Sequence, residues 1–351
     1  MLRTSLCCIL SLAAGMAGAT DIKGAGSVVA QPLYMSLIAL YVKTDPMGFA
    51  YQGKGSADGL KQLKAGNVDF STADVALSVA QRKADNLICF PISVSGVIPV
   101  VNLPGLHKGQ LKLTGDELAD IFARKILKWN DARLKADNPG LNLPDLGITV
   151  IVRADGAGTT YNFTDYLSKV SPAWNSAFGR GLSIKWASGT VAAKGNPALA
   201  QAVRETPGAI SYVDALLAAR DDLNYAMLKN HDGKFVAPGA ASFSAALARS
   251  TWTKRASYED MLTDLPGAGS WPITSGAFII VPQKSLRPAQ TIAALKFFTW
   301  GLIQGGPAVG QSDFVTLPEN VQGRIFGELT TITDTAGAPL AWSLADVLKL
   351  R

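Results

Sequence analysis

Short apolar runs alternate with segments of helical periodicity along most of the chain. Apolar runs bounded by glycine, proline or polar residues, such as 149–152, predict strands. Apolar residues three and four positions apart predict helices over 57–66 and 114–126, and Thr114 with Glu117 has the pattern of a helix-capping box. This alternation predicts an α/β fold in which helices pack on mostly parallel sheets.

Two long extended runs interrupt the alternation, at 90–104 and 271–282, where proline and glycine disfavour helix. The chain has 351 residues, more than one small core needs, so we expect two domains. No long low-complexity linker separates them, and the two extended runs are therefore expected to carry the chain from one domain to the other. No repeat with a period of about 20 to 50 residues is present, which argues against a solenoid or propeller.

The start of the chain (1–19) has the pattern of a secretory signal peptide. Arg3 precedes an apolar stretch, and Ala-Gly-Ala at 17–19 fits the small-x-small rule for cleavage. The apolar stretch is too short for a good membrane span. Cys7 and Cys8 lack the small-residue pattern that precedes a lipid-modified cysteine. We therefore expect a soluble exported protein rather than a lipoprotein, and hence a periplasmic location.

Cysteine and histidine are too few and too scattered for the usual metal sites or nucleophile triads. Removal of the leader leaves only Cys89, for which a buried free thiol is expected. His107 and His231 lack acidic neighbours at ligand spacing, and no G-x-S-x-G elbow is present. We therefore expect no metal, no cofactor and no histidine-based triad.

The basic residues give a net charge of +6 at neutral pH but are scattered along the chain. No run of lysine and arginine and no nucleic-acid recognition motif stands out, which argues against a nucleic-acid partner. A moderate positive charge can instead steer small anions toward the protein.

Three loops share one arrangement, in which an apolar strand is followed by glycine and hydroxyl residues and then by a helix. They lie within 22–43, 51–63 and 151–167. Helix N-termini carry unsatisfied N–H groups and a partial positive charge, and glycine lets the backbone approach a ligand, so such loops can hold an anion. Each loop alone is better explained as a turn with a helix cap. Three in one chain favour a site for a tetrahedral oxyanion.

Two charged residues in or near these loops are the main binding candidates. The guanidinium of Arg153 matches two oxygens of an oxyanion, and Asp155 is placed to hold it from behind; the alternative is a surface pair of little energetic value. Asp74 lies near the end of the expected strand 68–75. A carboxylate only accepts hydrogen bonds, so it would favour a protonated phosphate and reject sulfate. The alternative is that Asp74 caps the helix expected to begin at residue 75.

At these residues the chain resembles the periplasmic phosphate-binding proteins of bacterial phosphate ABC transporters, the PstS family. The likeness covers about residues 21–340. It is carried by GAG at 24–26, YQGKGS at 51–56, VDFSTAD at 68–74, VNLPGL at 101–106, RADGAGT at 153–159, PGAISYV at 207–213, WPITS at 271–275 and LKFFTW at 295–300. The resemblance implies a periplasmic binding protein-like fold whose two lobes close on phosphate in the cleft between them. The first lobe would comprise 20–96 and 274–351, and the second 97–273.

The same resemblance assigns roles to individual residues. Arg153 would bind phosphate, Asp155 would support the arginine, and Asp74 would accept the phosphate proton. Further contacts would come from Ser56, Gly158 and Thr159.

All three loops depart from the family pattern, the second through the charged residues Lys54 and Asp58, and the first and third at binding residues. Val28 and Val29 stand where a Thr-Phe pair is common, so their backbone N–H groups can still donate but a hydroxyl is missing. Ala157 replaces a binding serine. Each lost hydrogen bond to a charged ligand weakens binding by about 1.5–3 kcal/mol. The departures predict weaker phosphate binding or a site retuned for another tetrahedral oxyanion.

The expected function is the capture of inorganic phosphate, or a similar oxyanion, by a monomer that delivers it to a membrane ABC permease without catalysis. One alternative is a secreted phosphatase-like enzyme, which would lack metal ligands and an obvious nucleophile. Another is an exported sensory or surface protein. In that case the short amphipathic segment 341–351 would dock a partner, whereas otherwise it caps the core.

Overall fold

The computed structural model describes residues 21–255, 258–311 and 314–350, so the expected signal peptide lies outside the described residues. The strands are β1 (Ile22–Gly26), β2 (Phe49–Gly53), β3 (Phe70–Ala73), β4 (Leu87–Val101), β5 (Lys112–Leu113), β6 (Thr149–Arg153), β7 (Val191–Ala193), β8 (Ala209–Asp214), β9 (Met227–Lys229), β10 (Phe235–Val236) and β11 (Thr274–Pro282). The main sheet has the order β2-β1-β3-β11-β4-β8-β6-β7, and a small second sheet has the order β10-β9-β5.

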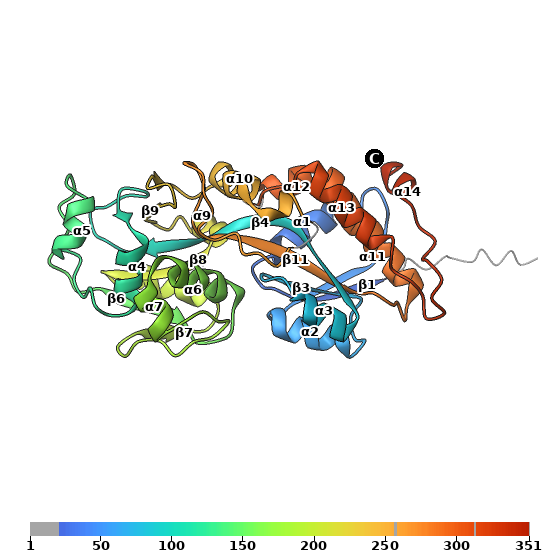
Figure 1. Cartoon of the computed structure of the whole chain (residues 1–351), viewed down its shortest axis with the longest axis horizontal. Helices are drawn as coiled ribbons and strands as arrows, with labels where there is room; N and C mark the ends of the chain where they lie inside the picture. Colours follow the sequence, from blue (N-terminus) through green and yellow to red (C-terminus); the bar gives the residue numbers. More distant parts are fainter. Residues whose placement is uncertain (1–20, 256–257, 312–313, 351) are drawn as a thin grey trace, which may run out of the picture.

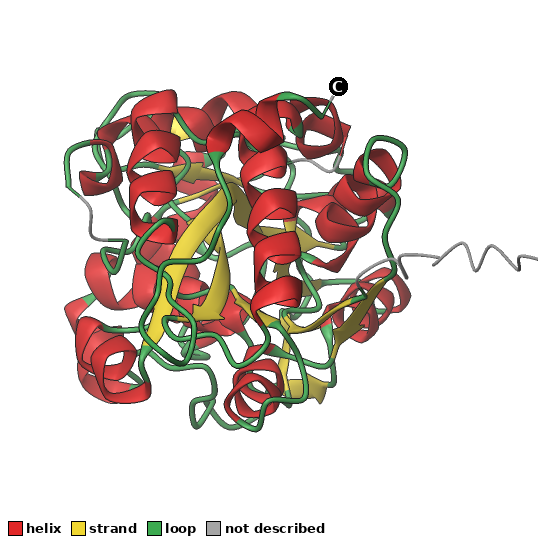
Figure 2. Ribbon diagram, turned by 90° about the vertical axis from the view of Figure 1, so that its right-hand side faces the viewer, coloured by secondary structure: helices red, strands yellow, loops and turns green. Residues whose placement is uncertain are grey.

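Helices cover the main sheet on both sides (Figure 2). They are α1 (Gln31–Tyr41), α2 (Ser56–Lys64), α3 (Val79–Asp85), α4 (Gly115–Phe122), α5 (Ala132–Asp137), α6 (Gly158–Val170), α7 (Pro172–Ala177), α8 (Asn196–Glu205), α9 (Ala215–Arg220), α10 (Ala240–Arg249), η1 (Thr251–Thr253), α11 (Pro288–Gln304), α12 (Gly306–Gln311), α13 (Glu319–Leu329) and α14 (Leu344–Leu348). None of the helices in the described part of the chain has the length and apolar character that a membrane crossing requires.

The long strands β4 and β11 run side by side through the middle of the molecule and join two lobes (Figure 1). One lobe contains β1–β3, α1–α3 and α11–α14, and is called the β1–β3 lobe below. The other contains β6–β8 and α4–α9, and is called the β6–β8 lobe. β4 pairs with β11 as far as Gly96 and with β8 from Val97 onward. The two extended runs recognised in the sequence thus form the central strands. The lobe boundaries expected from the sequence, after residues 96 and 273, stay a prediction.

Strand direction changes at the centre of the main sheet. β1 is parallel to β2 and β3, and β6 is parallel to β7 and β8, as expected for strands joined by helices. β11 is antiparallel to β3 and β4, and β4 is antiparallel to β8. The expectation of mostly parallel strands therefore holds within each lobe. The antiparallel centre arises because one strand leaves the first lobe and the other returns to it.

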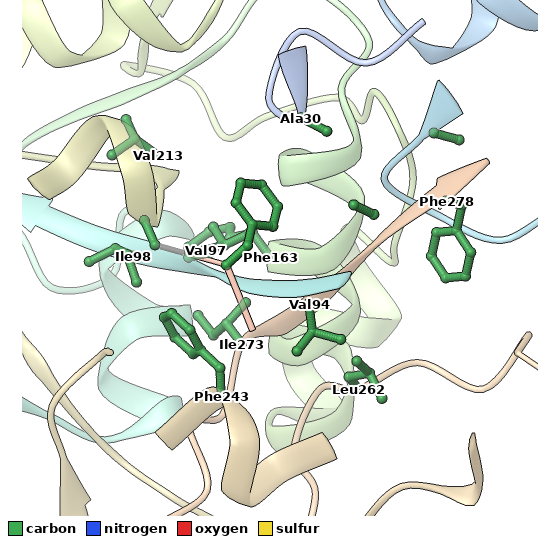
Figure 3. Close-up of a cluster of buried hydrophobic side chains, with 14 of the residues drawn as sticks. Ala30, Val94, Val97, Ile98, Phe163, Val213, Phe243, Leu262, Ile273 and Phe278 are labelled. Carbon is green, nitrogen blue, oxygen red and sulfur yellow. The ribbon is translucent and has the colours of Figure 1, made fainter. Parts of the chain in front are cut away.

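One apolar core runs through both lobes and the crossing between them. In the β1–β3 lobe the rings of Phe70 and Phe298 meet edge to face with centroids 4.8 Å apart, and in the other lobe Phe163 stacks on Tyr212 at 4.3 Å. Figure 3 shows Phe163 close to Val97 of β4, within a cluster of aliphatic side chains at the crossing. Aromatic pairs of this kind add about 0.5–1.5 kcal/mol each to the burial of apolar area.

Several local predictions are confirmed. Thr114 and Glu117 form the expected capping box at the start of α4. Cys89 is a buried free thiol. At the C-terminus, α14 packs on α11 and buries Val347, and the ring of Trp342 meets Phe326 edge to face. The C-terminal segment therefore covers the core, which is the interpretation of 341–351 that needs no partner.

Candidate functional site

A cavity of about 710 Å³ opens between the two lobes. It is lined by the N-terminal ends of helices from both sides: the turn before α1 and the start of α2 from one lobe, and the starts of α6, α8 and α9 from the other. Among the described residues, none accepts a hydrogen bond from the backbone N–H of Val28 or Val29. Helix ends carry unsatisfied donors and partial positive charge, so their convergence makes the cavity suited to an anion.

Arg153 ends β6 and is held from two sides. Its Nε donates to Asp155 Oδ1 at 2.8 Å, and its Nη2 donates to the other oxygen of the same carboxylate. On the opposite side Nη1 donates to Asn196 Oδ1 at 2.6 Å. The Arg153 side chain is only 8% exposed, and its hydrogen bonds lower the pKa of Asp155 to about 2. The Arg153–Asp155 pair is therefore an ordered part of the cleft wall and not a solvent-exposed surface ion pair.

Asp74 follows β3 and lies on the β1–β3 lobe, where its carboxylate accepts a hydrogen bond from the Ser27 hydroxyl. Burial, and in smaller part the negative charge of Asp214, raise the pKa of Asp74 to about 6, against the opposing effects of Ser27 and Arg153. The alternative that Asp74 caps the following helix is wrong. α3 begins only at Val79, and Ser78 is its cap.

The β6–β8 lobe touches Asp74 directly through the start of α6. A Cβ atom added to Gly158 would lie 2.2 Å from Asp74 Cβ, so only glycine fits there without a shift. Asn162, one turn later in α6, donates from Nδ2 to the backbone oxygen of Asp74 at 3.1 Å. The Asp74 carboxylate of one lobe thus lies against the helix end of the other lobe.

The cavity brings most of the residues expected from the sequence together. Val28, Val29 and Ser56 line it from one lobe, and Ala157 and Gly158 from the other. Val28 is 48% exposed, so it presents apolar surface at the edge of the cavity.

Thr159 lies behind the cavity wall. Its hydroxyl oxygen is 3.4 Å from both Arg153 Nη1 and Asn196 Oδ1. The residue lines a separate small void of about 10 Å³ together with Asp74 and Asp214. In this arrangement the threonine hydroxyl supports the arginine instead of facing the open cavity.

Sequence reasoning missed three residues of the site: Ser27, Asn196 and Asp214. Asp214 ends β8, much as Asp74 follows β3. Because ligands bind at the carboxyl ends of parallel strands, an acidic residue at such an end could have identified Asp214 as a site residue. Asn196 carried no such signal, because asparagine before proline is an ordinary helix start. Ser27 follows the first glycine-rich loop, but only folding brings it to Asp74, 47 positions away.

Both carboxylates and cations line the cavity. The carboxylates are Asp74, Asp155 and Asp214, and the cations are Arg153, Lys54, Lys194 and Arg220. Burial raises the pKa of Asp214 as it does that of Asp74. An anion that carries a proton can donate it to one of these carboxylates, which only accept hydrogen bonds, whereas a fully ionised anion cannot. No group of three or more histidine, cysteine or acidic side chains able to hold a metal occurs among the described residues.

Comparison with known proteins agrees with this architecture. A model of the PBP superfamily domain matches residues 13–302. The phosphate-binding protein PstS of Xylella fastidiosa is 40% identical over 300 residues, which cover 86% of this chain and 82% of the relative. The phosphate-binding protein PstS of Haemophilus influenzae is 40% identical over 315 residues, covering 90% and 94%. Among solved structures, a phosphate-binding protein from Stenotrophomonas maltophilia has a TM-score of 0.63 at 22% identity, covering 88% of this chain and 93% of that chain.

Two α/β lobes around a cleft lined by helix ends define a solute-binding protein of the periplasmic binding protein class. Within that class, the chain belongs to the PstS family of phosphate-binding proteins. The family and the fold expected from the sequence are thereby confirmed.

Proposed function

We propose that the protein captures inorganic phosphate in the cleft between its lobes and delivers it to a membrane ABC permease. The observation that carries the proposal is the position of Arg153, held by Asp155 and Asn196 in a cavity that also contains Asp74. A buried guanidinium that is held in place donates to a tetrahedral oxyanion with little loss of entropy. The names of the relatives point to the same ligand.

Selectivity for phosphate is assigned to Asp74. Ser27 donates to one oxygen of the carboxylate, which leaves the other as an acceptor for the proton of monohydrogen or dihydrogen phosphate. Sulfate carries no proton at neutral pH, so it has nothing to donate to the free oxygen of the Asp74 carboxylate. Leaving a buried polar group unpaired costs about 1–3 kcal/mol, and more for a charged group, so the same carboxylate attracts one anion and rejects the other.

Capture is assigned to closure of the lobes about the central strands β4 and β11. Phosphate would contact helix ends and side chains of both lobes only in the closed state, and this difference in contacts shifts the equilibrium toward closure. No bond is made or broken, so the protein acts as a carrier and not as a phosphatase. Export to the periplasm by the N-terminal segment completes the proposal.

Calorimetric titration of residues 20–351 with phosphate, arsenate and sulfate tests the proposal. We expect phosphate to bind and sulfate not to bind, and Arg153→Ala to weaken phosphate binding by about tenfold or more. Arg133→Ala is a matched control, because Arg133 pairs with Asp120 and Asp131 and does not line the cavity. Equal phosphate affinity of the Arg153→Ala variant and the wild-type protein would contradict the proposed site.

A further inference from the structure

We infer that Asn196 and Asp214 position Arg153 for its ligand, as a second support on the side opposite to Asp155. The inference rests on the proposed function for the choice of phosphate as the probe. Neither residue is proposed to bind the anion: Asn196 carries no charge, and both oxygens of Asp214 already accept hydrogen bonds within the protein. Their effect is to determine where the guanidinium points.

The contacts form a chain of hydrogen bonds. Arg153 Nη1 donates to Asn196 Oδ1 at 2.6 Å, and Asn196 Nδ2 donates to Asp214 Oδ2 at 2.7 Å. The other oxygen of Asp214 accepts from the backbone N–H of Leu217 at 2.9 Å, which anchors the carboxylate at the start of α9. Asn196 and Asp214 are 5% and 7% exposed, so solvent competes little for these bonds.

Asp214 sets the orientation of the Asn196 amide. An amide side chain has a donor end and an acceptor end, and a carboxylate can only accept. The NH₂ group of Asn196 must therefore face Asp214, and its oxygen then faces Arg153. The reverse orientation would place NH₂ against a guanidinium, which has only donors, and oxygen against a carboxylate, which has only acceptors. Loss of Asp214 would remove one of the two reasons for this orientation and leave the NH₂ group of Asn196 without its acceptor.

The two supports of Arg153 come from different parts of the lobe. Asp155 lies on the same loop as the arginine, two residues later, so the Arg153–Asp155 pair can move as a unit. Asn196 begins α8 and Asp214 ends β8, and both belong to the packed framework. The loop before α8 also holds Asp155, since the backbone N–H of Gly195 donates to Asp155 Oδ1 at 3.0 Å. The framework thereby ties down both members of the pair.

Phosphate titration by calorimetry with single and double variants tests the inference. We expect Asn196→Ala and Asp214→Ala each to weaken binding by about tenfold, as for loss of a hydrogen bond to a charged group. The double variant should bind no more weakly than either single variant, because both remove one linked support. In an Arg153→Ala background, neither change should have a further effect.

Two variants separate positioning from general damage to the fold. Asp214→Asn keeps one acceptor oxygen, which can still accept from Asn196 Nδ2, and gives up the bond from the Leu217 N–H. It should therefore lose thermal stability but bind phosphate more tightly than Asp214→Ala does. Asn138→Ala is the matched control: Asn138 is a buried asparagine whose Oδ1 accepts from the backbone of Lys112 at 2.8 Å, and it does not line the cavity. We expect Asn138→Ala to lower the thermal stability and leave phosphate affinity unchanged.

The outcomes distinguish this inference from the proposed function. If the wild-type protein binds phosphate and Asn196→Ala or Asp214→Ala binds equally well, the positioning role is wrong. If the wild-type protein does not bind phosphate, the proposed function is wrong, and the inference is judged on the ligand-free protein. There, NMR of the Arg153 guanidinium should show hindered rotation that becomes faster in Asp214→Ala but not in Asn138→Ala. Equal rotation in all three proteins would overturn it.

Discussion

At the residue scale, Ala157 is the position where this chain lacks a useful hydroxyl. It precedes α6 with extended backbone and no side-chain cap, and it lines the cavity. The N–H groups of the first turn of α6 therefore have no side-chain acceptor from the cap position. A serine at residue 157 could accept from one of them and donate to the ligand at the same time.

We expect Ala157→Ser to tighten phosphate binding by about tenfold and to stabilise the protein by about 1 kcal/mol. Calorimetry and urea unfolding measure the two effects separately. Gly239→Ser is the control, because it adds a hydroxyl at the cap of α10, which also lacks a side-chain cap but does not line the cavity. A gain in stability without a gain in affinity would show that the missing hydroxyl is not a binding group.

At the scale of elements, the decisive contact is that between the start of α6 and the end of β3. Gly158 allows the helix end to approach Asp74 so closely that an added Cβ would lie 2.6 Å from its Oδ2. This approach brings the first turn of α6 from one lobe against the carboxylate of Asp74 in the other, the group proposed to select phosphate. Glycine is needed here for space, since its backbone angles are not in the left-handed region.

We expect Gly158→Ala to push α6 away from Asp74, to weaken phosphate binding at least tenfold and to destabilise the fold by about 1–3 kcal/mol. Gly147→Ala is the control, because no atom lies within 4 Å of its added Cβ and Gly147 does not line the cavity. Titration and urea unfolding of both variants provide the measurement. Similar behaviour of the two variants would argue against the close approach.

At the scale of the whole molecule, the binding site reduces the stability of the ligand-free protein. In the proposed function Asp74 is ionised when it accepts a proton from phosphate, yet burial raises its pKa from 3.8 to about 6. The folded state therefore holds a proton on Asp74 more tightly than the unfolded state does. It follows that Asp74 makes the unfolding free energy fall as the pH rises from about 4 to 6, and the loss persists above pH 6.

We expect this fall to reach up to about 3 kcal/mol and to be absent in Asp74→Asn, which carries no titrating group at that position. Asp155, whose pKa is lowered to about 2, has the opposite effect, and that effect is confined to pH values below about 4. Urea unfolding of both proteins between pH 4 and 8 in phosphate-free buffer measures the difference. If the unfolding free energies of the wild-type protein and Asp74→Asn change in parallel with pH, ionised Asp74 does not destabilise the folded protein.

Local features of this protein were predictable from its sequence because neighbouring residues produce them. Periodicity identified helices such as α4, and the spacing of Arg153 and Asp155 placed an arginine beside its carboxylate. The order of short motifs indicated the PstS family. Each of these signals depends on residues within one turn or one loop, where the chain itself limits the distance between them.

Only the tertiary structure decided what Asp74 contacts and what holds Arg153. Asp74 was equally consistent with a helix cap, and its partners Ser27 and Asn162 lie 47 and 88 positions away along the chain. Asn196 reaches Arg153 because β7, which precedes it, pairs with β6. Asp214 reaches Asn196 because it ends β8, on the other side of β6. The cleft itself exists because β4 and β11 pair across the middle of the molecule. Contacts between distant segments depend on the packing of the whole chain, and no local pattern of residues encodes them.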